Sequence, residues 1–328
     1  YRSGSTKQEL RGLALQQFIL KKLNVSWDAT PCASATIEDI DEKAVAFFVK
    51  RAVKQKRIPE SCLEESAEQI LKRLHLITHD GQMTMAAMLL FGKDIEQWCP
   101  TAIFRIGRFG VSASDLIHND DIICPLIMMP DRIMETLRSR YLVSPIHYEG
   151  LERVEPLEIP ADGLREMLCN SIIHKDFQGT YIQMKVWNDH ITLWNPGTLP
   201  LDFTIDTLMA DHESIPRNKL IARAFYLAGY IEEWGRGYEK IRENFESEHL
   251  EMPTFSVVRG GFMANVKREV FCSVNSHPDN DHKEPQSGVE KSVEIGVEKA
   301  DTLQKPDKLY RNFTETLQKT DLDIIGLI

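Results

Sequence analysis

The sequence has no long apolar run and no signature of a nucleotide-driven motor, and its first residues do not have the pattern of a signal peptide. No stretch approaches the roughly 18 consecutive apolar residues of a transmembrane helix, so we expect no membrane-spanning segment. Residues 1–6 are not followed by the apolar core of a signal peptide. The P-loop pattern GxxxxGK[ST] is also missing, which argues against a motor of that class. The chain does not begin with methionine, and we expect it to be a fragment of a longer protein.

Clustered cysteines and an excess of positive charge are missing as well. The six cysteines stand singly, without a CxxC pair or a cluster with histidine. This spacing argues against a zinc site and a disulfide framework, and it favours a reducing, cytoplasmic location. The formal net charge of −10 argues against a protein that coats nucleic acid along its whole length, but it does not exclude a local basic surface.

What is present is the composition of a globular protein with room for two domains, at 328 residues, 42% hydrophobic and 27% charged. Apolar periodicity predicts helices at 6–23, 41–56, 64–74, 83–91 and 127–141, and a strand at 101–109. The pattern then predicts a helix at 161–176, strands at 180–187 and 190–194, helices at 217–230 and 234–246, and a closing hairpin at 255–267. A polar linker and another short apolar stretch follow.

Three polar side chains form a stripe on the helix predicted at 161–176. Glu166, Asn170 and His174 are spaced four residues apart, so they lie on one side, next to a broad apolar face. A solvated surface would more often carry lysine–glutamate pairs, although an ordinary polar helix side is the alternative interpretation.

Two glycine-containing turns follow this helix in order. The first, Asn195-Pro196-Gly197, ends the predicted hairpin, and the second, Gly235-Arg236-Gly237, opens a helix. Free backbone N–H groups and the dipole at a helix N-terminus favour an anion such as phosphate. A GxG pattern alone is a weak signal, and its order after the Glu166/Asn170 stripe makes it more specific.

Four stretches resemble the histidine-kinase-like (GHKL) ATPase domain of bacterial predicted transcriptional regulators. They are LREMLCNSIIHKD at 164–176, ITLWNPG at 191–197, SIPRN at 214–218 and EWGRG at 233–237. In that family a Schlafen-type AlbA-like domain comes first, and a winged helix-turn-helix often comes last. Residues 1–6 are similar to the final strand of the first domain, and 85–93 to the connecting region, so the resemblance covers roughly residues 1–268.

The resemblance implies an α+β fold, a two-layer α/β sandwich of the GHKL (Bergerat) type, preceded by a mostly helical connecting domain. The expected division is a tail of the AlbA-like domain with a helix (1–24), the connecting domain (25–118), the ATPase-like domain (119–270), a flexible linker (271–306) and the start of a helical, winged-helix-like module (307–328).

The resemblance also assigns roles to individual residues. Glu166 corresponds to the general base, and Asn170 to the ligand of a magnesium ion that bridges the phosphates of ATP. Asn195 and Gly197 occupy the adenine turn, and Gly235 and Gly237 the phosphate turn. His174 and Arg217 complete the expected cofactor-binding set. Residues 216–218 would be a lid over the pocket, with an ordinary proline-started helix as the alternative.

The adenine turn departs from the family pattern, which makes the predicted site degenerate. Asn195 replaces the usual aspartate, so it can accept a hydrogen bond but supplies no charge. Leu199 stands where a second glycine belongs, and Pro196 removes one N–H donor.

We therefore expect a transcriptional regulator whose ATPase-like domain acts as a sensor or coupling module, with DNA bound through domains mostly outside this fragment. The alternatives are an ATP-dependent enzyme acting on DNA, helicase-like or a weak ATPase, and a scaffold that binds no nucleotide. A homodimer is left open. The basic run 50–57 could follow phosphates, but a solvated helix end is the favoured interpretation.

Overall fold

The computed structural model describes residues 25–143, 157–200, 203–210, 213–232 and 235–268, together with the backbone of 2–3, 6–7, 147–149 and 152–154. The expected linker (271–306) and terminal module (307–328) lie outside the described residues, as does most of the helix predicted at 6–23. Residues 6–7 of that helix are instead extended, because β1 (Arg2–Ser3) pairs antiparallel with β2 (Thr6–Lys7).

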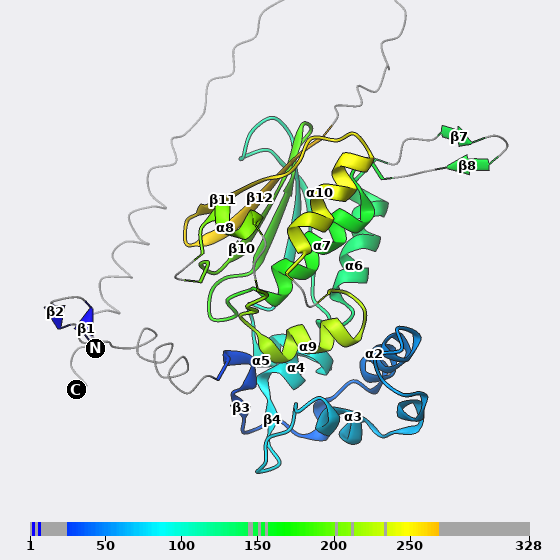
Figure 1. Cartoon of the computed structure of the whole chain (residues 1–328), viewed down its shortest axis with the longest axis vertical. Coiled ribbons are helices and arrows are strands. Elements are labelled where there is room, and N and C mark those ends of the chain that lie inside the picture. Colours follow the sequence, from blue (N-terminus) through cyan, green and yellow to red (C-terminus); the bar gives the residue numbers. More distant parts are fainter. Residues whose placement is uncertain are drawn as a thin grey trace, which may run out of the picture. The chain divides into compact units, whose positions relative to one another are not determined.

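A six-stranded mixed sheet organises the fold, which confirms the α+β prediction (Figure 1). Its strand order is β11 (Thr254–Val258), β12 (Gly261–Lys267), β10 (His190–Pro196), β9 (Ile182–Val186), β5 (Phe104–Phe109) and β6 (Leu116–Ile122). Neighbouring strands are antiparallel except β5 and β9, which are parallel. Both predicted hairpins, β9–β10 and β11–β12, are confirmed.

Two strands of this sheet begin before residue 119, where the ATPase-like domain is expected to start. β5 lies within the segment expected to be the connecting domain, and the expected boundary falls inside β6. The alternation in 101–109 predicts a strand, but the parallel partner of β5 is β9, more than seventy residues further along the chain. Local periodicity says nothing about such a distant partner, so the sheet begins at residue 104.

The segment before the sheet is mostly helical. It contains the 3-10 turns η1 (Trp27–Ala29), η2 (Ile37–Asp39) and η3 (Glu60–Glu64), the strands β3 (Pro31–Cys32) and β4 (Met83–Thr84), and the helices α2 (Glu42–Lys54), α3 (Ala67–Arg73), α4 (Met85–Phe91) and α5 (Ile95–Trp98). Local capping explains where the longer ones begin. The side chain of Asp41 accepts from the N–H of Lys43, and Ser66 and Gln69 form a capping box.

The helices that accompany the sheet follow the predicted order. They are α6 (Met129–Thr136), continued by the π-helical turn η4 (Leu137–Tyr141), then α7 (Ala161–Ile173), α8 (Ile205–Met209), α9 (Lys219–Leu227) and α10 (Gly237–Ser247). α7 and α10 lie side by side along the sheet (Figure 1). The short α8 has no counterpart among the predicted helices.

A buried ion pair lies beside Val143 and Glu158, the described residues on either side of the stretch that contains the antiparallel strands β7 (His147–Glu149) and β8 (Glu152–Val154). Arg268 meets Glu158 in a two-pronged contact, with N···O distances of 2.7 and 3.0 Å. Glu158 also accepts from the N–H of Val143 at 2.8 Å. Val143 and Glu158 are therefore held next to each other.

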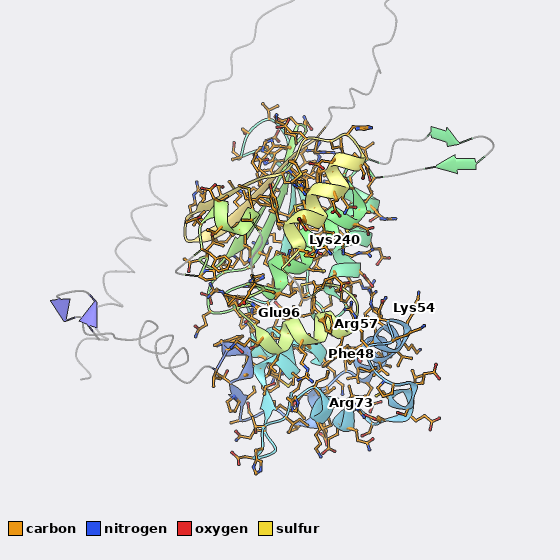
Figure 2. The ribbon with its side chains drawn as sticks, in the orientation of Figure 1. Phe48, Lys54, Arg57, Arg73, Glu96 and Lys240 are labelled. Carbon is orange, nitrogen blue, oxygen red and sulfur yellow. The ribbon has the colours of Figure 1, made fainter. Side chains whose placement is uncertain are left out.

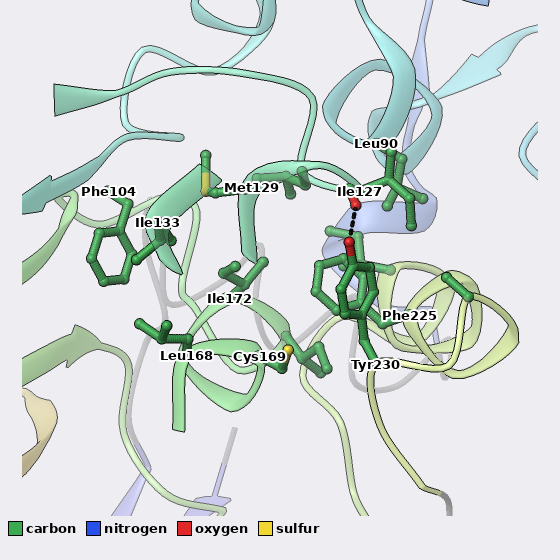
Figure 3. Close-up of a cluster of buried hydrophobic side chains, with 14 of the residues drawn as sticks. Leu90, Phe104, Ile127, Met129, Ile133, Leu168, Cys169, Ile172, Phe225 and Tyr230 are labelled. Atoms are coloured by element: carbon green, nitrogen blue, oxygen red, sulfur yellow. Dashed lines mark hydrogen bonds between the residues drawn. The ribbon is translucent and has the colours of Figure 1, made fainter. Parts of the chain in front are cut away.

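One continuous apolar core joins the helical segment to the sheet. Figure 3 shows its centre, where Leu168, Cys169 and Ile172 of α7 lie among side chains from α4, β5, α6 and α9. The hydroxyl of Tyr230 donates to the carbonyl of Ile127 at 3.0 Å, so this buried polar group has a hydrogen-bond partner. Within the described residues, no helix is both long and apolar enough to cross a lipid bilayer.

Leu168→Ala tests the importance of this core. Leu168 is fully buried at the centre of α7, and we expect the substitution to lower the free energy of unfolding by about 2–5 kcal/mol, through lost burial and the cavity left behind. The matched control is Leu63→Ala, because Leu63 is 52% exposed; its expected effect is within about 0.5 kcal/mol. Urea denaturation measures both, and equal small losses would contradict the shared core.

Candidate functional site

The polar stripe of α7 faces α10. Asn170 donates through Nδ2 to Oε1 of Glu166 at 3.1 Å, so the two residues form a pair on one side of α7. Glu166 is only 6% exposed, and Nζ of Lys240 on α10 lies 3.7 Å from its Oε2. Burial raises the pKa of Glu166, while Lys240 and the hydrogen bond from Asn170 oppose that rise.

The first residue of α10 approaches this pair so closely that a side chain there would displace the Glu166 carboxylate. A Cβ at Gly237 would lie 2.7 Å from Oε1 of Glu166 and 3.2 Å from Nδ2 of Asn170. Gly235 has a φ of +68°, a backbone conformation that favours glycine. The sequence therefore places glycines where the N-terminus of α10 meets the carboxylate of α7.

Asn195 brings a buried polar group to the same region. It follows Ile191 and Leu193 at period two along β10, so its side chain lies on the buried face of the sheet. Asn195 is 6% exposed, and its Oδ1 has no hydrogen-bond partner among the described residues. A buried acceptor without a donor is costly, and a ligand N–H would satisfy it.

Arg217 ties the end of α7 to the loop that follows β10. Its Nε donates to the carbonyl of His174 at 3.2 Å, and its Nη2 donates to the carbonyl of Thr198 at 2.7 Å. The guanidinium lies against Gly197, because a Cβ added there would be 3.3 Å from Nε of Arg217. Gly197 has a φ of +131°. Arg217 thus fixes the backbone around the first glycine turn.

All eight residues predicted for the site line one cavity of about 600 Å³. They are Glu166, Asn170, His174, Asn195, Gly197, Arg217, Gly235 and Gly237. The cavity is bounded by α7, the end of β10, the loop after it and the start of α10. Leu199, which stands where a second glycine is expected, lines the same cavity.

Two buried polar lining residues lie outside the eight predicted for the site, although Asn218 belongs to the expected lid 216–218. Asn218 is 1% exposed, and its Nδ2 donates to the carbonyls of Ile173 and Lys175, both at 2.8 Å, which holds the C-terminal end of α7 in place. Lys175 is also 1% exposed, and burial lowers its pKa to about 8. Both lie within stretches that carry the family resemblance, but no local pattern indicates that these polar side chains are buried.

The described residues include no preformed group of the usual metal-binding side chains. In the part of the chain that the structure describes, no group of three or more histidine, cysteine, aspartate or glutamate side chains could hold a metal ion. A cation at this site would therefore need oxygen ligands from a bound molecule in addition to protein atoms.

Comparison with known families gives two partial matches. Residues 179–266 match the family described as "Putative ATP-dependent DNA helicase recG C-terminal", which is an ATPase-like domain. Residues 16–102 match a second family, described as "Domain of unknown function (DUF8451)". No curated protein matches the sequence.

Among solved structures, the chain is similar to the DIP2311 protein from Corynebacterium diphtheriae, with a TM-score of 0.58 and 16% sequence identity. The match covers 74% of this chain and 40% of that protein. At this level of identity the similarity shows the fold alone.

The raised pKa of Glu166 predicts how stability depends on pH. Between the ordinary glutamate value of 4.5 and its higher folded value, the native state binds more protons than the unfolded state, so stability falls as pH rises through that window. Glu166→Gln removes the buried charge, and we expect it to be more stable than the wild type at about pH 8 and to lose this advantage towards about pH 4.

Thermal unfolding across this pH range measures the difference between the two proteins. Glu96→Gln is the control, because Glu96 is exposed. An advantage of Glu166→Gln that stays constant with pH would show that the buried charge is not its cause.

Proposed function

We propose that the cavity binds an adenine nucleotide and that the chain is the nucleotide-sensing module of a DNA-binding regulator. The observation that carries this proposal is the unpaired Oδ1 of Asn195 in a cavity that also contains the Glu166–Asn170 pair and the start of α10. The match of residues 179–266 to an ATPase-like family supports the same ligand.

The residues fit the parts of such a nucleotide one by one. The buried Oδ1 of Asn195 suits the exocyclic amino group of adenine, which is a hydrogen-bond donor. The N-terminus of α10, with glycines at 235 and 237, suits phosphate, because free N–H groups and the helix dipole favour an anion. Asn170 turns Nδ2 towards Glu166, so its amide oxygen is the atom that would reach a magnesium ion held mainly by phosphate oxygens and water.

The expected weakness of the site also has a structural basis. Asn195 offers a neutral acceptor, which forms a weaker hydrogen bond than an ionised carboxylate. Leu199 fills part of the wall beside the first turn. We therefore propose modest affinity, suited to a site that reports nucleotide occupancy.

Sensing requires that nucleotide binding change the structure or the stability of another part of the protein. Met167 and Ile173 of α7 line the cavity and also belong to the core shared with the helical segment, so a change at the cavity can reach that segment through packed side chains. A ligand shifts such an equilibrium only as far as its affinities for the two states differ. DNA binding itself would belong to domains outside the described residues.

Slow hydrolysis is a second activity that one observation favours. Glu166 is a buried carboxylate whose pKa is raised, and its Oε1 lies against Gly237 at the start of α10. A base of raised pKa next to the phosphates could accept a proton from an attacking water.

Asn195→Leu tests nucleotide binding. It keeps a similar volume but removes the acceptor, and we expect the Kd for magnesium–ATP, measured by calorimetry on the whole chain, to rise about tenfold or more. Asn265→Leu is the matched control, because Asn265 also has an unpaired buried Oδ1 but does not line the cavity. Absence of wild-type binding, or equal effects of the two substitutions, would argue against the proposed adenine contact.

Glu166→Gln separates binding from hydrolysis. The substituted amide keeps the shape of the side chain but cannot act as a base, so we expect any phosphate release to fall by about 10²-fold or more while nucleotide affinity persists. A colorimetric phosphate assay with calorimetry on the same samples measures both quantities. Equal rates in wild type and variant would leave the cavity as a binding site only.

A further inference from the structure

Arg57, which lies three residues beyond the last residue of α2, holds the turn that leads from α9 into the cavity wall. Arg57 donates through Nη1 to the carbonyls of Tyr226 and Ile231, the latter at 3.1 Å. Its Nη2 meets both carboxylate oxygens of Glu232, at 3.0 and 3.1 Å. One guanidinium therefore holds both ends of the turn 226–232.

The surroundings of this contact suit an arginine. The guanidinium carbon of Arg57 lies 4.1 Å from the centre of the Tyr226 ring, and its side chain is only 17% exposed. Gly229, with a φ of +78°, lets the turn approach α2, since a Cβ there would lie 2.5 Å from Cγ of Gln55. Because Arg57 is used inside the molecule, it does not serve the phosphate-tracking role considered for the basic run 50–57.

The residues that Arg57 holds also line the cavity. Ile231 and Glu232 are both part of its wall, and three residues further along stands Gly235, followed by the Gly237 that abuts Glu166. Figure 2 shows Arg57 beside the end of α9, Lys240 on α10, and Arg73 lower down on α3. Arg73 pairs with Glu65 and not with the turn, and neither Arg73 nor Glu65 lines the cavity.

We propose that Arg57 is a positioning residue of the nucleotide cavity, through which the helical segment controls the wall formed by Ile231 and Glu232. This inference rests on the proposed function for its ligand, but the position of the wall can be measured without one. Coupling of this kind is reciprocal, so a nucleotide in the cavity stabilises the contact between α2 and the turn.

The test compares Arg57→Gln with Arg73→Gln, which removes the same charge from the same helical segment away from the cavity. Calorimetry with magnesium–ATP on the whole chain measures affinity. Hydrogen–deuterium exchange of residues 226–232, without nucleotide, measures the turn. We expect Arg57→Gln to weaken binding about fivefold or more and to speed exchange in the turn about fivefold, with Arg73→Gln close to wild type in both.

A double-mutant cycle separates positioning from a general loss of stability. Glu232→Gln should weaken binding, and combining it with Arg57→Gln should add little, because both remove the same contact. Arg57→Lys keeps the charge but lacks the planar guanidinium that donates to several acceptors at once. We expect it to restore only part of the affinity that Arg57→Gln loses. Affinity that tracks thermal stability across all variants, including Arg73→Gln, would overturn the positioning role.

The outcomes distinguish this inference from the proposed function. Wild-type affinity in Arg57→Gln overturns the inference and leaves nucleotide binding intact. If the wild type itself binds no nucleotide, the proposed function fails, and exchange then decides the inference. Faster exchange of 226–232 in Arg57→Gln alone upholds Arg57 as the residue that positions the wall, and unchanged exchange overturns it.

Discussion

The burial of α7 on almost every side is the constraint on which the rest of the structure depends. One side of this helix packs in the core through Leu168 and Ile172, and another carries Glu166 and Asn170 to the cavity. A helix held in this way cannot rotate to relieve a bad contact, because interiors are packed as densely as crystals. The carboxylate of Glu166 is therefore held at the cavity although burial disfavours its charge.

The elements around α7 are fixed by polar contacts at their ends. Asp28 accepts from the N–H groups of Leu220 and Ile221, at 2.8 and 3.0 Å, and so caps α9 from a part of the chain nearly two hundred residues earlier. Arg51 of α2 donates to the carbonyl of Ala228 at 3.2 Å, within the turn 226–232 that Arg57 also holds. Asn218 and Arg217 donate to backbone carbonyls at the C-terminal end of α7 and so fix that end. The helical segment is thus part of the framework of the cavity.

Such a framework places several unfavourable groups in one region. Glu166 and Lys175 are buried groups whose charged forms are disfavoured, and Asn195 has an unpaired acceptor. Groups that reduce stability are expected where a protein binds a ligand, because the ligand supplies the missing partners. In this chain all three line the same cavity, which is why we assign the function to that cavity.

The sequence by itself determined the α+β class, the order of α6, α7, α9, α10 and the hairpins β9–β10 and β11–β12, and eight of the residues that line the cavity. These features depend on local periodicity and on short motifs, which can be recognised in the sequence. Only the tertiary structure decided that β5 and β6 join the sheet, that Asn195 has no partner, and that Arg57 holds the cavity wall. Each of these depends on contacts between residues far apart in the chain, and a pattern of neighbouring side chains carries no information about such distant partners.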